Sequence, residues 1–156
     1  MKIKLLAIGK TDETYLNTGI EKYSQRLKHY IPFEFQIIPD VKMGSKINIE
    51  KQKEEEGAAI LKKISISDYV FLLDEKGKQH TSEDFASLLQ KRMNSGQDMV
   101  FVIGGPFGFS EELYQRANEK LSLSKMTFSH QMVRLFFTEQ LYRAFTILKG
   151  EKYHHS

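Results

Sequence analysis

Two basic side chains stand at the start of the last long apolar segment, where they could bind an anion. His130 and Arg134 are four residues apart, so they share one face of a helix. Basic groups placed in this way suit contact with a phosphate or with RNA. Arg143 lies nine residues beyond Arg134, on a different side of such a helix, and is expected to pair with Glu139 at i,i+4. The alternative is that carboxylates satisfy both arginines, which then only fix the position of the helix.

The chain ends in a second group of residues suited to nucleic acid. Lys152, Tyr153, His154 and His155 combine an ammonium group, an aromatic ring and two imidazoles. An aromatic ring can stack on an unstacked base while basic groups hold its phosphate. A frayed tail is the alternative. No metal site is expected, because no H-E-x-x-H motif supplies further ligands.

A glycine-rich turn follows a strand-like segment that is nearly all apolar. Gly104, Gly105 and Gly108 form a G-G-x-x-G sequence, which matches neither the dinucleotide fingerprint nor the Walker motif. Glu111 and Glu112 open the next helix and would repel a phosphate there. Since glycines leave room near the backbone, the sequence favours a ligand that is uncharged or cationic at this point. A tight turn that only reverses the chain is the alternative.

Two further segments are candidates for the same site. Asp74 and Glu75 end a predicted strand and would lie near the glycine turn if the two strands are neighbours. A solvated strand end is the simpler interpretation of these carboxylates. The segment 123–129 mixes polar and apolar residues and could wrap a purine with its backbone groups, although its pattern alone indicates only a connection.

The elements that must position these residues alternate between strand-like and helix-like along the whole chain. Apolar runs predict strands at 2–9, 33–38, 69–73 and 99–103, and helical spacing predicts helices at 15–30, 49–64, 81–94, 110–118 and 130–149. The segment 41–48 is expected to be a loop, and 121–128 a weak strand or an extended loop. The helix at 81–94 is expected to begin with a Thr or Ser cap, Thr81 or Ser82, and Ser110 is the expected N-cap of the next helix. This order predicts a single α/β domain over 1–156 with a mostly parallel sheet. The last predicted helix is apolar on more than one face, which indicates burial in the domain or contact with a partner subunit.

Composition limits the classes of protein to which the chain can belong. Its 156 residues are 40% hydrophobic and 28% charged, which suits one compact core without disulfides or a structural metal. The absence of cysteine removes thiolate metal sites and cysteine nucleophiles. No apolar run approaches the roughly 20 residues of a membrane span, and no secretory signal is evident, so a cytoplasmic location is expected. The 23 basic and 20 acidic residues give a net charge of +3, which permits a polyanionic partner without requiring one.

Five segments taken together resemble the RlmH family of small bacterial methyltransferases. They are 2–10 (KIKLLAIGK), 101–108 (FVIGGPFG), 121–134 (LSLSKMTFSHQMVR), 139–144 (EQLYRA) and the Tyr153–His154 ending. The match follows the order and length of the family over essentially the whole chain. The family methylates N3 of a pseudouridine in 23S ribosomal RNA, and the resemblance implies that reaction here.

The resemblance also implies a fold and a cofactor. The family belongs to the SPOUT superfamily, whose α/β domain has a trefoil knot near its C-terminus, and it acts as a homodimer. The implied cofactor is S-adenosyl-L-methionine, which has no phosphate and carries a sulfonium cation. Motif matching assigns its contacts to Leu73, Gly104, Gly105, Leu123, Ser124, Lys125, Met126, Thr127 and Phe128.

With the family as a guide, the basic and aromatic residues take catalytic roles. The hypothesis is that His130 or His154 assists removal of the N3 proton, and that Arg134 and Arg143 hold RNA phosphate or stabilise the developing anion. Tyr153 would stack on the base or orient it. Tail and cofactor site can come from different subunits, and the expected substrate is 23S rRNA within the assembled ribosome. The alternatives are a SPOUT methyltransferase for another RNA nucleoside, a non-catalytic ribosome-binding dimer and a nucleotide-binding regulator.

Overall fold

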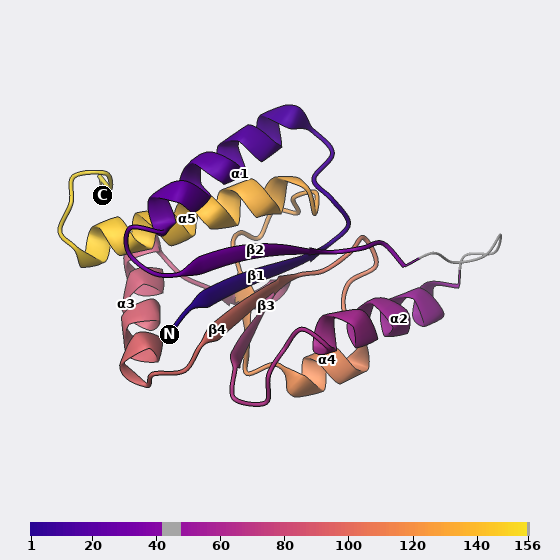
Figure 1. The fold of residues 1–156 in the computed structure, drawn as a ribbon. Helices are drawn as coiled ribbons and strands as arrows, with labels where there is room; N and C mark the ends of the chain where they lie inside the picture. The colour runs from indigo at the N-terminus through magenta and orange to yellow at the C-terminus, as the bar shows by residue number, and fades with distance from the viewer. Residues whose placement is uncertain (42–47, 156) are drawn as a thin grey trace.

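A computed structural model describes residues 1–41 and 48–155, which form one parallel sheet between two layers of helices (Figure 1). The strands are β1 (Ile3–Ile8), β2 (Phe33–Ile38), β3 (Tyr69–Gln79), β4 (Met99–Ile103) and β5 (Glu119–Ser122). Their order in the sheet is β2-β1-β4-β3-β5, and each neighbouring pair is parallel. All carboxyl ends therefore meet at one edge of the sheet, where ligands of open α/β proteins bind.

Helices cover both faces of this sheet (Figure 1). The helices α1 (Thr14–Leu27), α3 (Ser82–Asn94) and α5 (Met132–Leu148) lie on one face, and α2 (Ile49–Leu61) and α4 (Glu111–Arg116) lie on the other. Successive strand residues alternate between the two cores: Leu5 belongs to the α1/α3/α5 core and Leu6 to the α2/α4 core. A strand buried on both sides needs apolar residues throughout, which explains the continuous apolar run of β4 and, after Lys4, that of β1.

The structure confirms most of the predicted elements within a few residues of their expected ends. The Thr81 hydroxyl accepts a hydrogen bond from the Asp84 amide at 3.0 Å, so of the two expected caps Thr81 is the one used. The Ser110 hydroxyl accepts one from the Leu113 amide at 3.3 Å, which confirms the predicted N-cap there. The segment 121–128 is a strand only at its start, within β5, and continues as a loop. Most of the loop predicted at 41–48 lies outside the described residues.

The strand β3 differs from its prediction, because it continues to Gln79 after an irregularity. Leu73 and Lys78 both pair with Leu121 of β5, so the register shifts between them. Such a bulge takes the intervening residues out of the ladder and redirects their side chains. Gly77 closes the bulge: a Cβ there would lie 2.6 Å from the carbonyl carbon of Lys120.

The last helix, α5, lies across the middle of its face of the sheet, against α1 and α3 (Figure 1). Phe137, Leu141 and Ala144 are completely buried, which confirms that this apolar helix belongs to the core. Within the described residues, no helix is both long enough and apolar enough to cross a membrane. The trefoil knot that the resemblance implies stays a prediction.

Candidate functional site

A pocket of about 590 Å³ lies at the carboxyl edge of the sheet. Its walls come from the ends of β3 and β4, from the glycine turn after β4 and from the loop after β5. Its volume falls within the range of small-molecule sites. Leu73 stands opposite Ile103 in the β3–β4 pair, so the strands that carry the two candidate segments are indeed neighbours.

Most of the cofactor residues implied by the resemblance line this one pocket. Lys125 does not: it is exposed and lies outside the lining. The lining residues from that set are Leu73, Gly104, Gly105, Leu123, Ser124, Met126, Thr127 and Phe128. Tertiary structure therefore brings together three segments that are far apart in sequence.

The glycine turn has a packing requirement that the sequence did not reveal. A Cβ at Gly104 would lie 3.0 Å from the Phe109 ring, and one at Gly105 would lie 2.8 Å from the Glu56 carboxylate. Glu56 is only 4% exposed, and this burial raises its pKa, with a hydrogen bond from Gln52 acting in the opposite direction. Glycine is therefore needed for contacts behind the turn as well as for access to its backbone.

The loop after β5 is held by its own hydroxyl groups. The Ser122 hydroxyl donates to the Ser124 carbonyl at 2.9 Å, and the Ser124 hydroxyl accepts from the Met126 amide at 3.0 Å. Thr127 donates to the Glu75 carboxylate at 2.6 Å, which joins the loop to the end of β3. These bonds leave Met126 74% exposed and fix the backbone that borders the pocket.

Asp74 and Glu75 lie in the pocket wall, carried there by the β3 bulge. The Tyr114 hydroxyl donates to Asp74 at 2.8 Å, and the Lys76 amide donates to the same carboxylate at 2.9 Å. Burial, followed by the hydrogen bond to Asp74, raises the pKa of Tyr114 to about 12, so this phenol stays protonated at neutral pH. Asp74 is half-buried and Glu75 is exposed, so the expected solvated strand end describes Glu75, although both residues also line the pocket.

His130 and Arg134 have separate environments. His130 lines the pocket, whereas Arg134 is 1% exposed and is not part of the lining. Its guanidinium donates to the carbonyl oxygens of Gly9 at 2.6 Å, Ile8 at 2.8 Å and His130 at 3.2 Å, and to the Thr11 hydroxyl at 3.1 Å. Burial lowers the pKa of Arg134. The geometry therefore supports a positioning role for Arg134 and offers no surface through which it could hold RNA phosphate.

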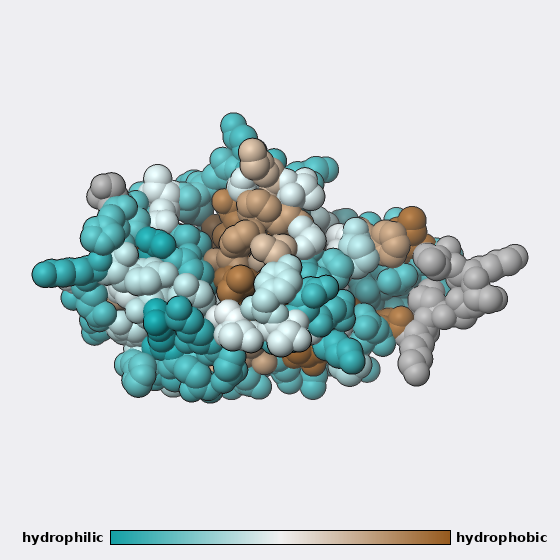
Figure 2. All heavy atoms as spheres, turned by 90° about the horizontal axis from the view of Figure 1, so that it is seen from above, coloured by the Kyte–Doolittle hydropathy of each residue, from teal (hydrophilic) through white to brown (hydrophobic). Residues whose placement is uncertain are grey.

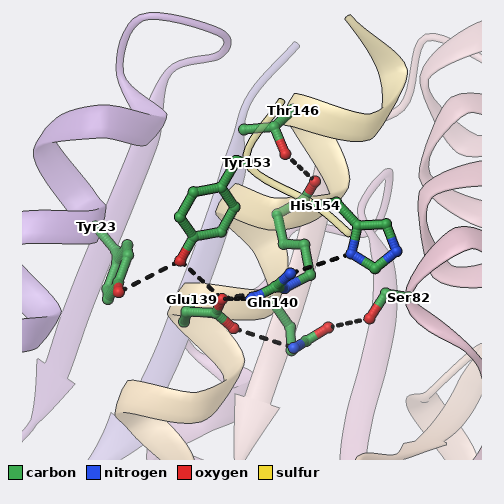
Figure 3. A network of polar contacts seen from close by, with 8 residues as sticks. Tyr23, Ser82, Glu139, Gln140, Thr146, Tyr153 and His154 are labelled. Atoms are coloured by element: carbon green, nitrogen blue, oxygen red, sulfur yellow. Dashed lines mark hydrogen bonds and ion pairs between the residues drawn. The ribbon is translucent and has the colours of Figure 1, made fainter. Parts of the chain in front are cut away.

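The tail residues form a polar network with the second half of α5 (Figure 3). Arg143 donates two hydrogen bonds to one Glu139 oxygen, at 2.6 and 3.1 Å, which confirms the predicted pairing. The Tyr153 hydroxyl donates to the same oxygen at 2.9 Å, and the Arg143 guanidinium carbon lies 4.8 Å from the centre of the Tyr153 ring. Tyr153 is half-buried, so at this residue the tail is packed rather than frayed.

His154 has a defined hydrogen-bonding role in this network (Figure 3). Its Nδ1 lies 3.1 Å from Arg143 Nη1, and its Nε2 lies 2.8 Å from a Glu83 oxygen. A guanidinium can only donate, so Nδ1 accepts and Nε2 carries the proton given to Glu83. This bond is the main cause of a lowered Glu83 pKa. The basic nitrogen of His154 thus faces a cation. Its partner Glu83 is 71 residues away and could not be predicted from a local pattern.

The two groups of predicted residues occupy different parts of α5. His130 precedes the helix and Arg143 is 13 residues later, a separation of about 20 Å at 1.5 Å per residue. Between them lies a smaller hollow of about 280 Å³, lined by Glu139 and Gln140 and sharing Leu123 and Phe128 with the first pocket. Within the described part of the chain, no three His, Asp or Glu side chains are grouped to hold a metal ion.

A parallel α/β sheet with a small-molecule pocket at its carboxyl edge defines a ligand-binding α/β domain of the kind used by many transferases. Residues 1–154 match a family described as "Predicted SPOUT methyltransferase". The chain belongs to this SPOUT methyltransferase family.

Curated relatives are similar over nearly the full length. Proteins named "Ribosomal RNA large subunit methyltransferase H" from Christiangramia forsetii, Flavobacterium johnsoniae and Parabacteroides distasonis are 63%, 58% and 56% identical, each with 99% of both chains covered. Among solved structures, a putative methylase family protein from Neisseria gonorrhoeae has a TM-score of 0.54 at 14% identity, with 90% of this chain and 81% of that chain covered. That likeness supports the fold alone.

Proposed function

We propose that this enzyme uses S-adenosyl-L-methionine to methylate N3 of a pseudouridine in 23S ribosomal RNA. The observation that carries the proposal is the single pocket that collects the implied cofactor residues together with His130. The names of the relatives, which act on large-subunit ribosomal RNA, support the substrate class.

The pocket suits the chemistry of this cofactor. Leu73, Ile103 and Phe128 provide apolar surface for an adenine ring, and the loop after β5 offers backbone groups for its polar edge. Asp74 and Glu75 suit a cation and disfavour a phosphate. When bound, the cofactor supplies a methyl group on a cationic sulfur, which leaves as a neutral thioether when a nucleophile attacks.

His130 is the side chain best placed to assist the acceptor. N3 of pseudouridine must lose its proton before it attacks, and an imidazole is suited to accept a proton near neutral pH. His130 lines the pocket, and its backbone carbonyl is held by Arg134. In this proposal Arg134 acts by positioning His130. Arg143 and Tyr153 contact the RNA.

A homodimer would bring the tail to the cofactor pocket of a second copy. Within one chain, the tail network and His130 are separated by about 20 Å along α5. Apolar side chains gather on the face that α1 and α5 cover (Figure 2). Phe136 on α5 is 38% exposed and Met126 in the preceding loop is 74% exposed, which suits contact with a partner. We propose the assembled ribosome, in the cytoplasm, as the substrate.

The test is methyl transfer from labelled S-adenosyl-L-methionine to ribosomes that lack the modification, with free 23S rRNA in parallel and nucleoside mass spectrometry of the product. We expect 3-methylpseudouridine on ribosomes and much less on free RNA. Label on another nucleoside would overturn the substrate assignment. No label despite cofactor binding would favour a non-catalytic ribosome-binding protein.

A further inference from the structure

Two carboxylates give the wall of the cofactor pocket a negative charge. Asp74 and Glu75 line it together with one basic side chain, Lys76, and the imidazole of His130. Among the described residues, no Lys or Arg nitrogen lies within 4.0 Å of either carboxylate, since the ion pairs involve Glu50, Glu83 and Glu139 instead. Both charges are therefore left without a close cation among residues 1–41 and 48–155.

Neutral hydroxyl groups hold these carboxylates in place. Tyr114 donates to Asp74 at 2.8 Å, and Thr127 donates to Glu75 at 2.6 Å. A hydroxyl donor orients a carboxylate without cancelling its charge. Thr127 also belongs to the loop assigned to the cofactor, so the position of the Glu75 charge is tied to the part of the pocket that the cofactor would contact.

We infer that Asp74 and Glu75 make this pocket selective for the sulfonium cofactor over its demethylated product. The inference rests on the proposed function. S-adenosylmethionine and S-adenosylhomocysteine share the same nucleoside and amino acid and differ by one methyl group and one positive charge. A negatively charged wall stabilises only the cationic member of this pair. The product is thereby bound less tightly than the reactant and leaves the pocket more readily after transfer.

The experiment compares ligand binding by isothermal titration calorimetry for the full chain and its variants. The probes are S-adenosylmethionine, S-adenosylhomocysteine and sinefungin, in which a charged amine takes the place of the methylsulfonium group. We expect Asp74→Asn and Glu75→Gln each to weaken binding of the two cationic ligands by about three- to tenfold and to leave product binding nearly unchanged. Retained product binding also shows that the variant is folded.

Matched variants separate charge from loop positioning. Tyr114→Phe and Thr127→Val remove the hydroxyl donors and keep both charges, so the ratio of reactant to product affinity should change less than in Asp74→Asn and Glu75→Gln. Lys76→Gln should move that ratio in the opposite direction, toward the cationic ligands. Glu34→Gln removes the same unit of charge on β2, at the far edge of the sheet, and should leave the ratio unaltered.

Two outcomes would count against the inference. Equal weakening of all three ligands by Asp74→Asn and Glu75→Gln would mean that the carboxylates only hold the loop. If neither variant changes the ratio of reactant to product affinity, the two carboxylates do not interact electrostatically with the cationic sulfur. If the unaltered protein binds none of the three ligands, the proposed function fails instead, and the two failures are therefore distinguishable.

Discussion

The guanidinium of Arg134 donates a 2.6 Å hydrogen bond to the carbonyl oxygen of Gly9, joining the start of α5 to the end of β1. The two residues are 125 positions apart in sequence. Because Arg134 also holds the carbonyl of His130, one buried side chain sets the position of His130 relative to the sheet.

Replacing Arg134 by Lys should destabilise the fold. Lysine keeps the charge but cannot reproduce the fork of donors, so buried carbonyl groups would lose their partners. We expect the free energy of unfolding, measured by urea titration, to fall by at least about 2 kcal/mol. Arg26→Lys on α1 is the control: its guanidinium lies 5.4 Å from the Tyr142 ring centre, and a weakened cation–π contact should cost less than about 1 kcal/mol. Unchanged stability with lost methyl transfer would instead indicate that Arg134 contacts the substrate.

His130→Asn should slow methyl transfer more than His154→Asn. His130 lines the pocket, whereas the basic nitrogen of His154 faces Arg143. Loss of a general base costs about 100-fold or more, and we expect that loss in single-turnover methylation of ribosomes by His130→Asn. Cofactor affinity, measured in parallel, should change little. A larger loss of the methylation rate in His154→Asn than in His130→Asn would assign proton removal to the tail.

Glu56→Gln should stabilise the protein increasingly as the pH rises above 4.5. The pKa of Glu56 is raised above its ordinary value of 4.5 by burial, so its ionised form is disfavoured in the folded state. Below that pH the carboxyl is protonated in both states; as the pH rises through the folded pKa, the stability that the protonated form contributes is lost. Glutamine removes this dependence. Urea unfolding at several pH values tests the effect, and Glu54→Gln, an exposed change on α2, should show no such trend.

Gly77→Ala should be more disruptive than Gly96→Ala. A Cβ at Gly77 would lie 2.6 Å from the Lys120 carbonyl carbon and 2.7 Å from the Leu121 amide nitrogen, which are backbone atoms of β5. At Gly96 the cost is only that of a positive φ of 76°, because no atom lies within 4 Å. We expect losses in unfolding free energy of about 3 and 1 kcal/mol respectively. Similar losses for both variants would show that the β3–β5 contact can relax.

Local patterns were enough to predict much of the fold. Apolar runs identified β1 and β4, and the i,i+4 spacing identified the Glu139–Arg143 pair. Hydroxyl side chains identified the cap at Ser110 and limited the other cap to Thr81 or Ser82. Each of these features depends on residues close together in sequence, where propensity, capping and side-chain spacing act directly.

Prediction of the site needed both the sequence resemblance and the tertiary structure. The resemblance assigned the cofactor residues, and the sheet order then placed Leu73, the glycine turn and the loop after β5 around one pocket. The β3 bulge and the Glu83–His154 bond had no sequence signal, because they arise from contacts between elements that are remote in the chain.

What the sequence determined by itself was the set of elements and the family, since periodicity and motifs are properties of neighbouring residues. Only the tertiary structure showed that Arg134 is a buried donor to backbone carbonyls rather than a surface cation. It alone also showed that Asp74 and Glu75 line a pocket. The physical reason is that burial and electrostatic environment depend on which distant segments pack together, and a side chain's chemistry follows from that environment.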